Sequence, residues 1–134
     1  MTPVDIIEVS FPGGKKVNAQ IGQFLVCTDQ SVKVGGEGSA PEPFALFLSS
    51  LATCAGIFAL GFCQARNIPS EGLGLRMACN WDQTRKLYTH INFQLTLPPD
   101  FPEIYRDSII KAVDLCTVKR HLMEPPNFEV TINN

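Results

Sequence analysis

Two cysteines occupy similar positions in the two halves of this 134-residue chain, and they are its best candidates for chemistry. Cys54 lies inside the long apolar run 44–58, and Cys116 ends a second, amphipathic run over residues 109–116. A thiol inside an apolar helix usually packs as a small hydrophobic side chain. Two such thiols form a redox pair if the fold brings them together, and the sequence by itself leaves both interpretations open.

A reactive thiol must first become a thiolate, which requires a helix end, a cation or another hydrogen-bond donor nearby. Cys54 is expected in the middle of its helix, where the helix dipole does not help it. The candidate cations are Lys15, in a Gly-Gly-Lys turn, and Lys119 and Arg120, one turn beyond Cys116. A second thiol within reach converts a sulfenic acid to a disulfide before the sulfur is over-oxidised.

Other kinds of site find little support in the residue pattern. The five cysteines, His90 and His121 show no spacing typical of a tetrahedral metal site, so we expect no metal. A protease-like pair of Cys116 with His121 is an alternative, although residues 119–121 are explained more simply as the solvated face of a short helix. The glycine cluster over residues 35–38 lacks the spacing of a phosphate-binding loop, and no bound cofactor is expected.

Composition argues against several classes of partner. The net charge is −2 and the isoelectric point is about 5.6, whereas nucleic-acid binding usually needs a basic patch or stripe. No run of lysine and arginine exceeds two residues, so an anionic membrane surface is not an expected partner either.

The chain has five cysteines: Cys27, Cys54, Cys63, Cys79 and Cys116. Because this number is odd and no Cys-x-x-Cys spacing occurs, the cysteine pattern indicates a reduced, cytoplasmic compartment. The first residues carry Asp5 and Glu8 and no basic segment, so we expect no signal peptide.

Residues 43–65 are uncharged and long enough to cross a bilayer. They also contain serines, a threonine, glycines and a glutamine, and we interpret them as a buried helix of a soluble protein.

Hydrophobic periodicity predicts a single α+β domain over residues 1–134. Residues 73–81 and 87–97 alternate at period two, which predicts an antiparallel pair with one solvated face. Pro43 suits the first position of a long central helix. The expected order is β-β-β-α-β-β-α-β, over residues 4–11, 16–19, 23–28, 43–66, 73–81, 87–97, 102–115 and 128–132.

Two segments carry a resemblance to a known family. Residues 35–54 run Gly-Gly-Glu-Gly-Ser-Ala-Pro-Glu-Pro-Phe-Ala-Leu-Phe-Leu-Ser-Ser-Leu-Ala-Thr-Cys, and residues 112–122 run Ala-Val-Asp-Leu-Cys-Thr-Val-Lys-Arg-His-Leu. Both resemble the signature of the OsmC/Ohr family of organic hydroperoxide reductases. The order of the expected elements is similar to that family over nearly the whole chain.

This resemblance implies an OsmC-like fold in an intertwined homodimer, with two long central helices and two sites at the subunit interface. It implies that Cys54 is the peroxidatic thiol and Cys116 the resolving thiol. It also implies that an external dithiol, rather than a bound cofactor, reduces the resulting disulfide. The leading hypothesis is therefore a cytoplasmic thiol peroxidase that reduces an organic hydroperoxide to an alcohol.

Two positions depart from the family pattern. Peroxidases of the family hold the thiolate with an arginine in the first hairpin, where this chain has Lys15, a point charge without the planar fork of a guanidinium. They also have a glutamate just after the helix-starting proline, where this chain has Phe44 after Pro43, with only Glu42 nearby. Two alternatives therefore stand beside the peroxidase. One is an OsmC-fold protein that binds a small molecule or handles sulfur in the interface pocket, and the other is a structural dimer with two packed thiols.

Overall fold

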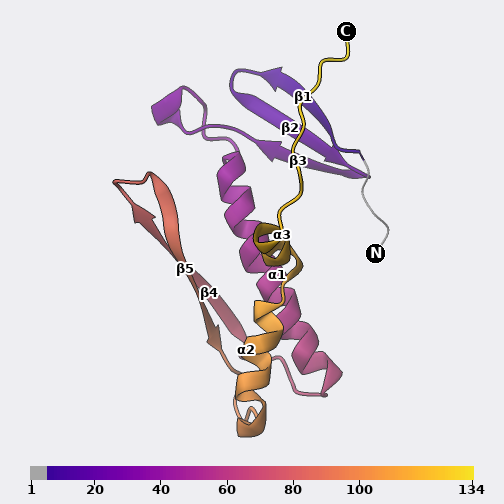
Figure 1. Ribbon diagram of the computed structural model, residues 1–134, viewed down its shortest axis with the longest axis vertical. Coiled ribbons are helices and arrows are strands. Elements are labelled where there is room, and N and C mark those ends of the chain that lie inside the picture. The colour runs from indigo at the N-terminus through magenta and orange to yellow at the C-terminus, as the bar shows by residue number, and fades with distance from the viewer. Residues whose placement is uncertain (1–5) are drawn as a thin grey trace. The chain divides into compact units, whose positions relative to one another are not determined.

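The computed structural model describes residues 6–134 and divides into two compact units, one ending at Ser49 and the other beginning at Ser50. The amino-terminal unit contains an antiparallel sheet whose strands follow one another in chain order (Figure 1). A turn at Gly14 and Lys15 joins the first two strands, and Gly14 adopts a positive φ of 59° that favours glycine. The strands are β1 (Glu8–Gly13), β2 (Lys16–Ile21) and β3 (Phe24–Thr28), followed by the 3₁₀ turn η1 (Val32–Val34).

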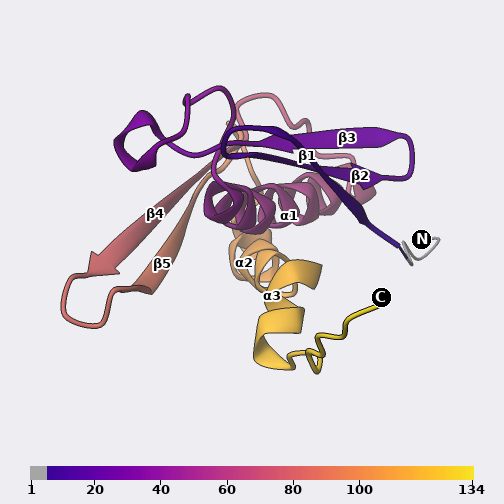
Figure 2. The same ribbon diagram turned by 90° about the horizontal axis from the view of Figure 1, so that it is seen from above.

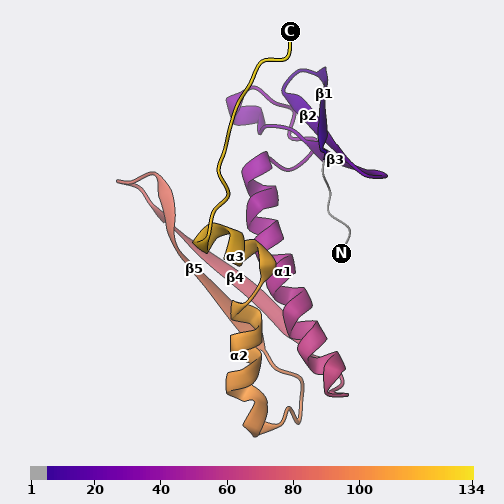
Figure 3. The ribbon, with the colours of Figure 1, turned by 45° about the vertical axis from the view of Figure 1, so that its right-hand side comes forward.

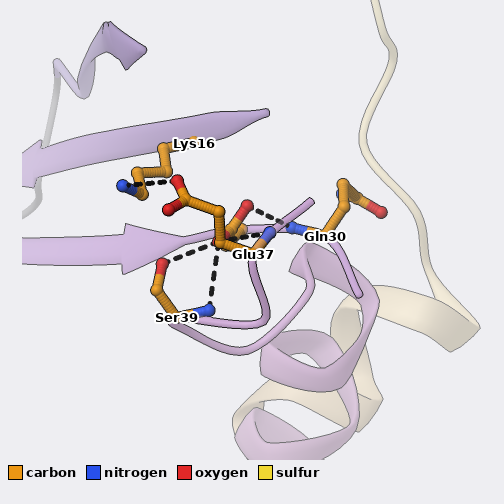
Figure 4. Close-up of polar contacts among 5 residues, drawn as sticks. Lys16, Gln30, Glu37 and Ser39 are labelled. Carbon is orange, nitrogen blue, oxygen red and sulfur yellow. Dashed lines mark hydrogen bonds and ion pairs between the residues drawn. The ribbon is translucent and has the colours of Figure 1, made fainter. Parts of the chain in front are cut away.

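A buried carboxylate organises the loop that follows β3. Asp29 is fully buried, and its oxygens accept hydrogen bonds from the Gln30 N–H at 2.7 Å, the Ser39 hydroxyl at 2.6 Å and the Ser39 N–H at 3.0 Å. The hydrogen bonds from Ser39 and Gln30 lower the pKa of Asp29 to about 2, because they stabilise its charged form. Glu37, which belongs to this loop, forms an ion pair at 2.8 Å with Lys16 at the start of β2 (Figure 4).

The long helix α1 (Pro43–Ala65) begins at a proline, which suits the first helical position. It ends where Asn67 takes a positive φ of 54° and the Ile68 N–H donates to the Cys63 carbonyl. By length and composition alone, α1 is long and apolar enough to cross a membrane, and 28% of its most apolar window is buried. Core helices of soluble proteins pass the same test, so this property is weak evidence for a membrane span.

The carboxyl-terminal unit joins the remainder of α1 to a two-stranded antiparallel ribbon and two further helices (Figure 3). These are β4 (Gly74–Asp82), β5 (Leu87–Thr96), the 3₁₀ turn η2 (Glu103–Tyr105), α2 (Arg106–Asp114) and α3 (Thr117–Met123). The ribbon extends away from the helices toward its turn at residues 83–86 (Figure 2). The core consists of Ala55, Ala59, Phe62, Cys63, Phe101, Ile109 and Val113, flanked by half-buried Leu75, Phe93 and Leu95 from the ribbon.

The sequence prediction was wrong for the last strand. In the described part of the chain no strand follows α3, and the alternating side chains Phe128, Val130 and Ile132 are 88%, 96% and 84% exposed. A strand forms only when a neighbouring strand accepts and donates its backbone hydrogen bonds, and sequence alternation cannot supply that neighbour. The first strand was expected from residue 4, but residues 4 and 5 lie outside the described range.

The second predicted helix is also shorter than expected and is followed by a third. Residues 102–115 were expected as one helix, but α2 begins only at Arg106, after the turn η2. It ends at Asp114, and Cys116 adopts an extended conformation with φ −57° and ψ 140° before α3 starts. The break therefore falls at one of the two candidate thiols.

Candidate functional site

The structure brings the two thiols that motivated the redox hypothesis close together. Cys54, in the middle of α1, lies close enough to Cys116, between α2 and α3, to raise the pKa of the Cys116 thiol. Cys54 is half-buried, whereas Cys116 is only 1% exposed. Both are free thiols in this structure. The two cysteines are therefore neighbours with unequal access to solvent.

The break between α2 and α3 is what positions Cys116. Its extended backbone makes it the N-cap of α3, and its sulfur accepts the Lys119 N–H at 3.4 Å. An N-cap side chain that accepts such a bond satisfies one of the free N–H groups of the first helical turn. The Cys116 carbonyl meanwhile accepts the Arg120 N–H at 3.1 Å, so α3 begins directly at the thiol.

Burial raises the pKa of the Cys116 thiol above its ordinary value, because a thiolate is poorly solvated in this environment. The backbone N–H groups of Lys119, which donates to the sulfur, and of Val118 act in the opposite direction, since they favour the charged form of the sulfur. The neighbouring Cys54 thiol and its negative charge when ionised raise the pKa of Cys116 further. Ionisation of Cys116 is therefore disfavoured next to a charged Cys54.

A cavity of about 940 Å³ lies beside Cys116 within the carboxyl-terminal unit. This volume lies within the range typical of small-molecule sites, which are mostly apolar with a few polar groups. Its apolar wall is formed by side chains that include Leu51, Phe93, Leu95, Phe101, Ile109, Val113, Leu122 and Met123. Its polar groups are Asn92, Asp100, Arg106, Asp114, Lys119 and the Cys116 thiol.

Comparison with known proteins identifies the family. The sequence profile of the family described as OsmC-like protein matches residues 36–131, which is more than half of the chain. The chain belongs to the OsmC-like family. No relative of curated function matches it.

Solved structures of OsmC-like proteins have the same fold. An OsmC-like protein of Mycoplasma pneumoniae superposes with a TM-score of 0.71 at 19% identity, covering 93% of this chain and 91% of that one. A Psychrobacter arcticus structure described as an osmotic-stress-induced and detoxification-response protein gives 0.72 at 17%, covering 90% and 89%. The organic hydroperoxide resistance protein OsmC of Legionella pneumophila gives 0.57 at 15%, covering 90% and 91%. At these identities the likeness establishes the fold, and the predicted α+β OsmC-like fold is confirmed.

The two cations expected next to Cys116 differ in their surroundings. Lys119 of this OsmC-like protein lines the cavity, and its ammonium pairs with the Asp114 carboxylate while its backbone N–H contacts the thiol. Arg120 is exposed. Asp114 was not predicted from the sequence. The usual helical pairings join residues three or four apart, and Asp114 reaches Lys119, five positions on, only because the helix breaks between them.

Lys15 and Glu42, the other two supporting residues predicted from the sequence, belong to the amino-terminal unit. Lys15 lies in the turn between β1 and β2, and its Cε atom is 3.6 Å from the position that a Cβ atom on Gly35 would take. Glu42 accepts a hydrogen bond from the Ser31 N–H at 3.2 Å, just before α1 begins. The role of both residues in the redox site stays a prediction.

The other three cysteines lie on β3, α1 and β4 and differ in exposure. Cys79 on β4 is half-buried, whereas Cys27 on β3 is exposed, so the core position that its strand pattern indicated is wrong for Cys27. Cys63 is fully buried in the core, and burial raises the pKa of its thiol, opposed by the charge of Arg66. Within residues 6–134, no group of three or more potential metal-ligating side chains gathers in one place.

Proposed function

We propose that this OsmC-like protein is a thiol peroxidase that reduces organic hydroperoxides through Cys54 and Cys116. The observation that supports the proposal is the proximity of a half-buried thiol to a fully buried one. The exposed partner meets the peroxide first, and the buried partner stays protonated until it is needed. This division of roles agrees with the family to which the chain belongs.

The proposed cycle has two chemical steps within the protein. The Cys54 thiolate attacks one oxygen of the hydroperoxide; an S–O bond forms, the O–O bond breaks, and the alcohol leaves with a proton, giving a Cys54 sulfenic acid. Cys116 then attacks that sulfur; the S–S bond forms, the S–O bond breaks, and water leaves. An external dithiol reduces the disulfide by thiol–disulfide exchange and is itself oxidised to a disulfide.

We further propose that the protein acts as a cytoplasmic homodimer. The helix α1 carries no charged residue, yet most of its apolar window is not buried within one chain, and Ile57 on it is 57% exposed. Exposed apolar surface on this scale typically marks an interface. A second copy of the chain is the partner that a two-fold assembly would place against it.

The experiment that tests the peroxidase proposal measures peroxide consumption by the purified full chain. Cumene hydroperoxide and hydrogen peroxide are each supplied with dithiothreitol, dihydrolipoamide or glutathione as reductant. We expect turnover of the organic peroxide with the dithiols, little with the monothiol, and none in Cys54→Ser. Wild-type protein that turns over neither peroxide with any dithiol would contradict the proposal.

A second experiment asks which cation activates Cys54. Alkylation of Cys54 is followed against pH by peptide mass spectrometry in wild type, Lys15→Met and the Lys119→Met, Arg120→Met double variant. If a cation activates the thiol, removal of that cation shifts the profile to higher pH. If the alkylation of Cys54 depends on pH in all three proteins as that of a small-molecule thiol does, none of Lys15, Lys119 and Arg120 activates Cys54.

The second candidate function is binding of a small apolar molecule in the cavity of about 940 Å³ beside Cys116. The cavity and the lysine in place of an arginine at position 15 favour this candidate. It predicts that an apolar fluorescent probe binds wild type and Cys54→Ser equally well, and that a bulky substitution in the wall, Val113→Trp, displaces it. Absence of peroxidase turnover together with such binding would make it the better description.

A further inference from the structure

Three residues around the break between α2 and α3 line the same cavity: Asp114, Cys116 and Lys119. Lys119 contacts its two neighbours through different atoms. Its backbone N–H donates to the Cys116 sulfur at 3.4 Å, whereas its ammonium pairs with the Asp114 carboxylate. The ammonium of Lys119, in the first turn of α3, therefore pairs with Asp114 and not with the Cys116 sulfur.

Lys119 neighbours two groups that are negatively charged when ionised, the Asp114 carboxylate, which holds its ammonium, and the Cys116 sulfur, which accepts its backbone N–H. Lys119 is the third residue of α3, and a side chain at this position leans back toward the N-cap, as the glutamate of a capping box does. The N-cap here is Cys116 itself. The neighbouring groups that lower the pKa of Cys116 are the N–H groups of Lys119 and Val118, and they do not outweigh burial, which raises it. With the ammonium on Asp114, the thiol stays protonated.

We propose that Asp114 is a positioning residue for the resolving step, which holds the Lys119 ammonium in the resting site and yields it to the Cys116 sulfur when that sulfur ionises. This inference rests on the proposed peroxidase function. In the resolving step Cys116 gives up its proton, and its sulfur attacks the Cys54 sulfenic acid. The S–S bond forms, and hydroxide leaves from the broken S–O bond and takes up the proton as water. The transferred ammonium stabilises the thiolate that exists between these events.

The other charged groups near the site come from three elements. Cys54 on α1 lies close enough to Cys116 to raise the pKa of its thiol. Arg106 on α2 and Asp100 in the segment after β5 line the cavity, and Arg106 pairs with Glu103 at 3.5 Å. The side chains that β5 contributes to the cavity are uncharged: Ile91, Asn92, Phe93 and Leu95. Among the described residues that line the cavity, Asp114 is thus the acid that holds Lys119.

A purely structural ion pair makes a different prediction. The Asp114 and Lys119 side chains are 68% and 35% exposed, and exposed ion pairs contribute little to stability. If the ion pair is only a surface contact with no effect on the thiol, its removal leaves the reactivity of Cys116 unchanged. If Asp114 controls the ammonium, its removal increases that reactivity, and only while Lys119 is present.

The test measures alkylation of Cys116 against pH, without peroxide, in full-length protein carrying Cys54→Ser. Asp114→Asn, Lys119→Met and the double variant are compared, with Asp107→Asn and Lys111→Met as matched controls that make the same charge changes elsewhere on α2. We expect Asp114→Asn to raise the alkylation rate near neutral pH about tenfold, which corresponds to a shift of about one pKa unit. We expect Lys119→Met and the double variant to react slowly and alike, and both controls to match the background protein.

Two outcomes would overturn the proposal. If Asp114→Asn leaves the profile unchanged, the carboxylate does not control the ammonium. If the acceleration persists in the double variant, it comes from loss of the negative charge itself rather than from a released lysine. Because the assay uses no peroxide, its result is independent of whether the protein turns over hydroperoxides. Circular dichroism of each variant confirms that the fold is retained.

Discussion

The Cys54 thiol lies close enough to Cys116 to raise the pKa of its thiol, although the whole β4–β5 ribbon lies between these two residues in the chain. Only Cys116 is fully buried, and both burial and the charge of Cys54 raise its pKa. A pair of equivalent thiols would give no reason for one to react before the other. This pair is asymmetric, and the asymmetry leads to the first prediction.

Replacement of the buried thiol should stop the cycle after its first half. In Cys116→Ser we expect one equivalent of organic peroxide to be consumed and a Cys54 sulfenic acid to accumulate, because no second thiol resolves it. Trapping with dimedone and mass spectrometry measures that species. With excess peroxide, the same cysteine should progress to sulfinic acid in the variant and not in wild type. Equal sulfinic acid formation in the two proteins would show that Cys116 does not protect Cys54.

The N-cap role of Cys116 predicts a separate effect on stability. Its sulfur accepts the Lys119 N–H, and a serine hydroxyl is a preferred group for the same task. Cys116→Ala should therefore be less stable than Cys116→Ser by about 1 kcal/mol. Urea unfolding of the reduced proteins at one fixed concentration measures the difference. Equal stabilities of the two variants would mean that the cap contributes nothing.

The sequence predicted most of the fold because the periodic patterns were long. The strands expected over residues 73–81 and 87–97 agree with β4 and β5 to within one residue at each end, and the helix expected over 43–66 ends within one residue of α1. The failures occurred where local pattern is not sufficient. Residues 128–132 alternate like a strand but have no neighbour within the described chain, and strand formation depends on that neighbour.

The site was harder to predict than the fold. Both thiols were identified from the sequence, but their contact depends on how α1 packs against α2, which no local pattern encodes. Asp114 was missed because the helix break at Cys116 had not been anticipated, and the ion pair with Lys119 exists only across that break. The buried Asp29 was not predicted either, since a lone aspartate gives no sign that a loop will fold around it.

The buried Asp29 predicts a particular dependence of stability on acid. Hydrogen bonds from Ser39 and Gln30 lower its pKa to about 2, so the ionised carboxylate favours the folded state. This contribution is complete above the unfolded pKa of about 3.8 and is lost as the pH falls toward 2. Asp29→Asn should be less stable than wild type at pH 7, and the difference should narrow between pH 4 and pH 2. Asp107→Asn, an exposed acid on α2, serves as the control and should show no such narrowing; a constant deficit in Asp29→Asn would argue against the linkage.

Two adjacent isoleucines on α2 provide a matched test of the core. Ile109 is fully buried between α1 and the β4–β5 ribbon, whereas Ile110 is largely exposed in one chain. Ile109→Val should lower the free energy of unfolding by about 0.5–1.5 kcal/mol, because it removes a buried methylene group. Ile110→Val should change it by less than about 0.5 kcal/mol. Denaturant unfolding of both variants measures the contrast, and a larger loss for Ile110 would reveal that a partner chain buries it.

The apolar face of α1 predicts the assembly state. Wild-type protein should be recovered without detergent and should sediment as a dimer at micromolar concentration, with an interface above about 2,000 Å² as in obligate dimers. Ile57→Asp places a charge on the exposed apolar face of α1 and should weaken that dimer, because an unpaired charge in an interface is costly to desolvate. Leu87→Asp makes the same change at the turn of the ribbon, which extends away from the helices, and should leave the dimer intact (Figure 2). A monomeric wild type would remove the dimer proposal, and wild type that requires detergent for recovery would instead favour a membrane-associated α1.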